Sequence, residues 1–243
     1  MTWIGGRRGS YLIAGVVAVA VIALGWAAFA RVHAAHMEHR LLTTPADMVA
    51  KDKALTRFAV AEARPLFQRN CASCHGADLR GHPAIGAPNL ADHVWLYGDG
   101  SVFQIERTIM YGIRSGHRKS HDVTEMPAFG LRGQLSETDI DNVVEYVLGL
   151  SGRQHNVQAA ELGAAVFTGP ASCNDCHDTD GRGNSDYGAP DLTVNTWAWG
   201  GDQKSLHDSV YYGRHGEMPG WYGKLTLAQI RALSVYVHDA SSK

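Results

Sequence analysis

Cysteine is scarce in this sequence, since its 243 residues include only four. The chain also lacks any run with the period-two alternation of a half-buried strand, which argues against a β-rich fold. It lacks a charge excess as well, because 22 basic side chains stand against 24 acidic ones. Surfaces that bind nucleic acid are usually basic. We therefore expect an all-α fold and no nucleic-acid partner.

All four cysteines lie in two copies of the pentapeptide C-x-x-C-H, at residues 71–75 and 173–177. Two thiols at this spacing can each form a thioether with a haem edge, and the histidine that follows can ligate the iron. A zinc site would need more ligands, and a thioredoxin-like redox pair does not need the histidine. We predict two covalently bound haem c groups, held by Cys71, Cys74 and His75 and by Cys173, Cys176 and His177.

An internal repeat extends well beyond these motifs. Fifteen residues after the first cysteine of each motif the chain reads Gly-Ala-Pro, followed by Asn-Leu in one copy and Asp-Leu in the other. The further matches are Trp95 with Trp197, Tyr111-Gly112 with Tyr212-Gly213, Met126-Pro127 with Met218-Pro219, Ile140 with Ile230 and Tyr146-Val147 with Tyr236-Val237. The pattern indicates a tandem duplication of one small domain, whose core a buried haem would complete.

Helix signals recur in both copies. Ser136 and Thr226 resemble the first residues of capping boxes, and apolar residues at helical spacing follow each of them. Gly112 and Gly213 are placed to end helices. Pro65 fits the first turn of a helix that runs into Cys71.

The remaining iron ligands are inferred from the repeat. Met126 and Met218 precede prolines at the same place in both copies, so we predict them as the sixth ligands of the irons. The first methionine loop is longer and contains His117 and His121, either of which could compete with Met126.

Two further pairs of residues are expected to support the haems. A ligand histidine usually donates its other ring nitrogen to a carbonyl, and Pro88 and Pro190, thirteen residues after the two histidines, are placed to offer one. Trp95 and Trp197 are further candidates for cofactor contact.

An uncharged apolar run of 22 residues, Gly9 to Ala30, precedes the repeat. As a helix it is about 33 Å long, enough to cross a bilayer. The apolar core of a signal peptide has only about 7–15 residues. Despite a possible cleavage site at residues 32–34, we expect the run to be retained as an anchor. Because c-type haem is attached outside the cytoplasmic membrane, we predict a single-pass inner-membrane protein with periplasmic haem domains.

Charge is unevenly divided along the chain. Basic and acidic residues number 7 and 3 in residues 1–60, 8 and 11 in residues 61–152, and 7 and 10 in residues 153–243. The two acidic haem domains could steer a basic redox partner.

The motif, the Gly-Ala-Pro-Asn-Leu stretch and the distal Met-Pro resemble class I cytochrome c over residues 61–243. A fuller pattern resembles the dihaem subunit of cbb3-type cytochrome c oxidases; it comprises residues 70–76 (NCASCHG), 88–92 (PNLAD), 95–98 (WLYG), 126–129 (MPAF) and 146–152 (YVLGLSG). The resemblance implies a membrane anchor (1–40), a linker (41–60) and two tandem cytochrome c domains (61–152 and 153–243) with His/Met haems.

The same resemblance implies an electron-transfer subunit that is not itself catalytic. Electrons would come from a soluble cytochrome c or a quinol-oxidising complex and pass to the other subunits of a membrane respiratory complex. The longer first methionine loop and the Trp-Ala-Trp-Gly of residues 197–200 depart from the family pattern. Two alternatives remain open: the cytochrome subunit of a periplasmic dehydrogenase, and a dihaem peroxidase with one exchangeable iron site.

Overall fold

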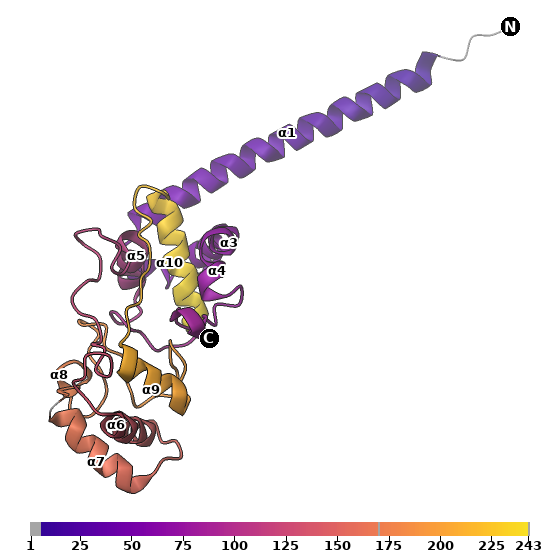
Figure 1. Ribbon diagram of the computed structural model, residues 1–243. Coiled ribbons are helices and arrows are strands. Elements are labelled where there is room, and N and C mark those ends of the chain that lie inside the picture. Colours follow the sequence, from indigo (N-terminus) through magenta and orange to yellow (C-terminus); the bar gives the residue numbers. More distant parts are fainter. Residues whose placement is uncertain (1–5, 170, 243) are drawn as a thin grey trace. The chain divides into compact units, whose positions relative to one another are not determined.

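The computed structural model describes residues 6–169 and 171–242, with side chains from residue 15 onwards (Figure 1). It divides into two compact units, Met1–Thr44 and Pro45–Lys243. The first contains one long helix and the second contains both C-x-x-C-H motifs.

The first unit is formed by α1 (Gly6–Thr43). Its segment Gly15–Thr43 is long and apolar enough to cross a membrane, and no other helix among the described residues meets that test. Large apolar side chains such as Val19, Leu24 and Trp26 are exposed along it. This agrees with the predicted apolar run, although the helix continues beyond Ala30 into polar sequence.

The second unit is helical, and its described residues contain isolated β-bridges but no strand. The prediction of an all-α fold is therefore confirmed. Its elements are α2 (Ala46–Val49), α3 (Lys53–Asn70), α4 (Ala72–His75), η1 (Pro83–Ile85), α5 (Val102–Tyr111), α6 (Glu137–Leu150), α7 (Val157–Thr168), α8 (Asn174–His177), α9 (Gln203–Tyr212) and α10 (Leu227–Ser241).

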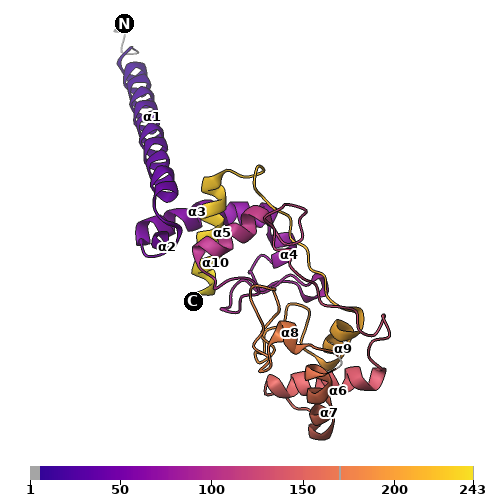
Figure 2. The same cartoon turned by 90° about the vertical axis from the view of Figure 1, so that its left-hand side faces the viewer.

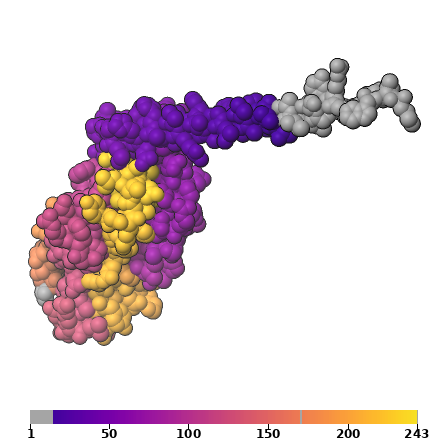
Figure 3. Space-filling model, turned by 90° about the horizontal axis from the view of Figure 1, so that it is seen from above, coloured from indigo at the N-terminus to yellow at the C-terminus, as the bar shows by residue number. Residues whose placement is uncertain are grey.

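The helices of this unit form two groups, and each group draws on both sequence repeats. The last helix, α10, packs against α3 and α5 near the first motif, whereas α6 packs against α7 and α9 near the second. Figures 1 and 2 show both groups from perpendicular directions. In the space-filling view the yellow C-terminal residues lie directly beside purple residues of the first half of the chain (Figure 3).

An aromatic pair holds the main helix contact of each group. Phe67 on α3 meets Tyr236 on α10 with ring centroids 5.5 Å apart, and Phe167 on α7 meets Tyr146 on α6 at 5.2 Å. Both contacts are edge-on, the geometry that aromatic quadrupoles favour. The two phenylalanines are 2% and 1% exposed. Burying each ring stabilises its group by roughly 1.5–3 kcal/mol.

Helix α3 begins earlier than the sequence predicts. Asp52 accepts hydrogen bonds from the backbone of Ala54 and Leu55 and starts the helix at Lys53. Pro65 therefore lies inside α3, and its predicted place in the first turn is wrong. The cap at Asp52 is the stronger start signal, and an internal proline removes one backbone donor. The range 41–60, expected as a linker, contains the end of α1, all of α2 and the first turns of α3.

The other predicted helix ends are confirmed. Ser136 and Thr226 each form a complete capping box at the starts of α6 and α10. Such a cap stabilises a helix by about 1 kcal/mol. Gly112 and Gly213 follow the last residues of α5 and α9 with φ of 73° and 71°, a region that glycine enters without strain.

Candidate functional site: two haem-binding motifs

Both C-x-x-C-H motifs form a single helical turn, α4 and α8. The backbone N–H of Cys71 donates to the Phe67 carbonyl at 2.8 Å, and that of His75 donates to the Cys71 carbonyl at 2.9 Å. In the second motif the N–H of Cys173 donates to Phe167, and that of His177 to Cys173, both at 2.9 Å. The single helical turn brings the first cysteine and the histidine to one side of the motif.

Each motif histidine faces the carbonyl that the sequence predicts for it. Nδ1 of His75 lies 3.4 Å from the Pro88 oxygen, and Nδ1 of His177 lies 3.1 Å from the Pro190 oxygen. Burial lowers the pKa of both histidines, and the contacts with the proline carbonyls oppose that change. A neutral ring that donates through Nδ1 leaves Nε2 free to ligate a metal. The part of these residues in ligating iron stays a prediction.

Two glycines that the sequence analysis missed close the loops onto these prolines. Gly81 and Gly183 donate their N–H groups to the carbonyls of the motif histidines, both at 2.9 Å. Their φ angles are 80° and 74°, and a Cβ at either position would meet the carbonyl of the proline. A signal for them exists in the repeat, because both stand ten residues after the first cysteine of a motif.

The motif thiols do not resemble a zinc site. Burial raises the pKa of Cys71 and of Cys173 to about 11. Zinc binds thiolates and usually takes four protein ligands at a structural site. Among the described residues no group of three or more His, Cys, Asp or Glu side chains could hold a metal ion. Two thiols and one histidine fit thioether attachment of a haem instead.

The surroundings of the second motif also fit a haem. The indole Nε1 of Trp197 is buried without a hydrogen-bond partner among the described residues. An indole N–H can only donate, and leaving it unpaired costs about 1–3 kcal/mol. A haem carries carboxylates at its edge, which could accept this bond. Trp95 is the equivalent residue of the first repeat, and its indole ring lies against Gly100.

The two methionines lie beside helix ends of the opposite repeat. Met218 and Ile113, which follows α5, donate their N–H groups to each other's carbonyls at 2.9 Å. Met126 and Arg214, which follows α9, make the equivalent pair at 3.2 Å. Met126 also packs against the core cluster of α6, α7 and α9, which Cys173 contacts too. The structure therefore brings Met126 together with the second motif, and Met218 with α5 of the first.

The two histidines of the first methionine loop stack on tyrosines and make hydrogen-bond contacts with other residues of the chain. His121 stacks on Tyr97 with ring centroids 4.3 Å apart, and its Nε2 lies 3.1 Å from the Thr108 hydroxyl. His117 stacks on Tyr111 at 4.8 Å, and its Nδ1 accepts the N–H of Lys119. These contacts favour methionine over histidine as the iron ligand.

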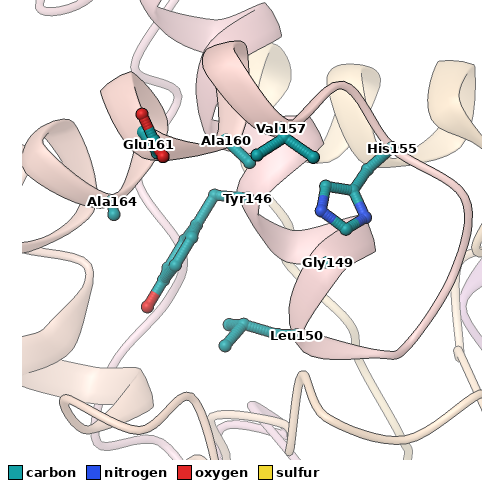
Figure 4. Close-up of a pocket in the computed structure, with 8 residues that line it drawn as sticks. All are labelled: Tyr146, Gly149, Leu150, His155, Val157, Ala160, Glu161 and Ala164. Atoms are coloured by element: carbon teal, nitrogen blue, oxygen red, sulfur yellow. The ribbon is translucent and has the colours of Figure 1, made fainter.

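A shallow apolar hollow lies on α6 and α7 (Figure 4). Tyr146 and Leu150 line it from α6, Val157 and Ala160 line it from α7, and His155 lines it from the connection between the two helices. It includes none of the predicted haem ligands.

Residues 60–151 match the cytochrome c family model, and residues 158–237 match that of cytochrome c oxidase, cbb3-type, subunit III. The cbb3-type cytochrome c oxidase subunit CcoP of Cereibacter sphaeroides is 40% identical over 211 residues, which cover 87% of this chain and 71% of that protein. Subunit FixP of Azorhizobium caulinodans is 42% identical over 200 residues (82% and 66%), and FixP of Bradyrhizobium diazoefficiens is 43% identical over 193 (79% and 64%). The chain thus spans about two thirds of the length of these relatives.

Proposed function

Because this chain belongs to the CcoP/FixP family of cbb3-type cytochrome c oxidase subunits, we propose that it is a membrane-anchored dihaem cytochrome that carries electrons to the catalytic subunit of such an oxidase. Its two cytochrome c domains bind haem c. The observation that carries the proposal is the pair of C-x-x-C-H motifs in one compact unit, each with its histidine directed to a proline carbonyl.

The residues have the following proposed roles. Cys71, Cys74, Cys173 and Cys176 hold the two haems covalently, and His75 and His177 ligate the irons from one side. Pro88 and Pro190 fix the histidine rings. Met126 and Met218 supply thioether sulfurs, which stabilise the reduced iron and raise its potential. Trp95 and Trp197 line the haem edges. A bound haem supplies the one-electron chemistry, and the protein orients it and limits its contact with water.

The location and donor are also part of the proposal. The apolar part of α1 anchors the protein in the inner membrane, and the haem unit lies in the periplasm. Electrons arrive from a soluble cytochrome c or a quinol-oxidising complex. The acidic balance of residues 61–243 would attract a basic donor.

Oxygen uptake by membranes tests the function. Deleting the gene should abolish oxygen reduction with reduced cytochrome c and leave quinol-oxidase activity in the same membranes unchanged. The full chain should restore the activity. A Cys173→Ala/Cys176→Ala variant, which cannot attach the second haem, should not restore it although immunoblotting finds it in the membrane. Loss of alcohol- or sugar-dependent respiration with unchanged cytochrome c oxidation would contradict the proposal and favour a dehydrogenase subunit.

A further inference from the structure

We propose that Tyr97 and Trp199 are positioning residues of the haem sites, because each ring holds the loop that leads to the histidine-binding proline of the other repeat. The proposal rests on the haem function proposed above. It adds two residues that act on the motif histidines through the chain before Pro88 and Pro190. Neither ring is a predicted iron ligand, and Trp199 belongs to the Trp-Ala-Trp-Gly segment that departs from the family pattern.

A pair of backbone hydrogen bonds closes each of these two loops. His82 and Ala87 donate their N–H groups to each other's carbonyls at 2.9 and 3.3 Å. Asn184 and Ala189 make the equivalent pair, both bonds at 3.0 Å. Each alanine is followed directly by the proline whose carbonyl faces the motif histidine. A displacement of either loop therefore moves that carbonyl as well.

An aromatic ring from the other repeat lies against each loop. Trp199 places its indole against Gly86 of the first repeat. Tyr97 places its phenol ring against Gly188 of the second, and a Cβ at either glycine would overlap the ring. Both glycines have positive φ, 68° and 70°, and both stand two residues before the proline. In the repeated Gly-Ala-Pro sequence the glycine thus leaves room for the ring, and the proline faces the histidine.

Trp199 is held in place by Arg214 of its own repeat. The guanidinium carbon lies 4.7 Å from the centroid of the Trp199 ring, which is a cation–π contact. Arg214 also donates to the hydroxyl of Ser209 at 2.8 Å and to the carbonyl of Ser205 at 3.2 Å. Both serines lie on α9. The ring that covers the first loop is therefore fixed to a helix of the second repeat.

Tyr97 is held by a different basic side chain. Its ring stacks on His121 with the centroids 4.3 Å apart, and Tyr97 is only 8% exposed. Nε2 of His121 lies 3.1 Å from the hydroxyl of Thr108 on α5. The ring that covers the second loop is therefore fixed to a helix of the first repeat.

The contacts between histidine and proline leave little room for the loops to move. Nδ1 of His75 lies 3.4 Å from the Pro88 oxygen, longer than the usual range of about 2.7–3.2 Å, and the second pair is closer at 3.1 Å. A carbonyl in this place orients a ligand histidine and raises its basicity. Loss of the covering ring would let the loop move and weaken the contact. A less basic histidine stabilises the oxidised iron less, so the midpoint potential of that haem should rise.

Exchange of the histidine N–H protons in the full dihaem protein tests the proposal. With isotope-labelled histidine, NMR of the reduced protein in detergent follows the Nδ1–H groups of the two ligand histidines. In Trp199→Leu one of these protons should exchange with water severalfold faster, and in Tyr97→Leu the other should do so. Trp199→Phe and Tyr97→Phe keep a ring on each loop, so exchange should stay slow. Phe103→Leu is the control, because it removes a ring that is 56% exposed and should change neither proton.

A redox titration of the same proteins gives a second measurement. Trp199→Leu should raise the midpoint potential of one haem and leave the other near its original value. Tyr97→Leu should raise the potential of the other haem, and the double variant should raise both. The two phenylalanine variants should stay close to the parent protein.

The contrary outcomes are distinct. If Trp199→Leu lowers the unfolding midpoint but changes neither exchange nor potential, the ring only stabilises the fold and the proposal is wrong. Equal acceleration of both protons in one variant would indicate a general loosening and would also overturn it. A parent protein without two iron-bound histidines would instead reject the haem function on which the proposal rests.

Discussion

Gly112 and Gly213 let two chain segments approach more closely than a side chain would allow. Both have positive φ, and a Cβ at either position would meet the carbonyl of a predicted methionine ligand: Met218 at Gly112 and Met126 at Gly213. A single added carbon would therefore push a ligand segment away from the helix end that holds it. The geometry of each predicted haem site therefore depends on the backbone conformation of one glycine.

We expect Gly112→Ala to lower the free energy of unfolding by about 1–3 kcal/mol through backbone strain and the clash with Met218. It should also weaken the sulfur-to-iron absorption band of the oxidised protein. Gly116→Ala is the matched control, because Gly116 has φ of 77° but open space around its Cβ position. Denaturant unfolding and the absorption spectrum measure both effects. Equal losses in the two variants would mean that the contact with Met218 contributes nothing.

Local spacing predicts part of the site well. The two prolines were expected to offer carbonyls to the motif histidines, and the structure places those carbonyls at 3.4 and 3.1 Å. These contacts are predictable because each histidine and its proline are only thirteen residues apart in the sequence. The partner of each methionine was not predictable in the same way, since Met126 and Met218 hold the same place in the repeat. Only contacts between distant segments distinguish them.

Helices α5 and α10 are joined by the ion pair of Glu106 and Arg231, which is nearly buried. Removing one member of a buried pair leaves the other charge without its counterion, which typically costs 3–5 kcal/mol. We therefore expect Arg231→Met to lower the free energy of unfolding by about 3 kcal/mol or more.

The exposed pair of Lys204 and Asp208 on α9 provides the control, with 82% of the lysine side chain exposed. Lys204→Met should change stability by less than about 1 kcal/mol, because water screens such pairs. Urea titrations of both variants make the comparison. A loss of similar size in both would show that burial of the Glu106–Arg231 pair is unimportant.

The stability that the N-terminal cap of α9 contributes should decrease at acidic pH. Asp202 accepts hydrogen bonds from the N–H and the hydroxyl of Ser205, and these bonds lower its pKa. A lowered carboxyl pKa contributes stability that is present above the ordinary pKa and lost as pH falls through the folded value.

Asp202→Ala should therefore cost about 1 kcal/mol at neutral pH, and the deficit should shrink as pH falls below about 4. Asp202→Asn keeps a capping oxygen without a titrating charge, so its stability should not show this acid dependence relative to Asp202→Ala. Thermal unfolding over a pH series checks both. An Ala deficit that does not change with pH would contradict the assigned cap.

At the scale of the whole molecule, the sequence predicts where the helices lie in the chain. It does not predict which helices pack against one another. The capping residues Ser136 and Thr226 and the end glycines define similar helices in both repeats. Two similar copies can pack within themselves or across each other with nearly the same apolar contacts. Contacts between distant segments, such as that of Glu106 on α5 with Arg231 on α10, distinguish the two, and such contacts are not visible in the sequence of either copy alone.

The two compact units should be separable. Replacing residues 1–44 with a cleavable export signal should yield a soluble periplasmic protein with both haems, since no described helix after Thr44 could span a membrane. Fractionation and a haem stain of the denatured protein measure this. A version in which an unrelated transmembrane helix replaces residues 1–44 should return to the membrane. If the soluble version sediments with membranes after a salt wash, the second unit has its own attachment.

The packing of α10 on α3 also governs the order in which the chain can fold. Phe67 on α3 is covered by α10, which leaves the ribosome after α6, α7 and α9 are complete. Contacts between such distant segments close slowly, because a long loop must first be ordered. Any chain that stops before α10 leaves the apolar face of α3 uncovered and open to aggregation. The surroundings of the first haem motif are therefore completed after those of the second, although the first motif is synthesised earlier.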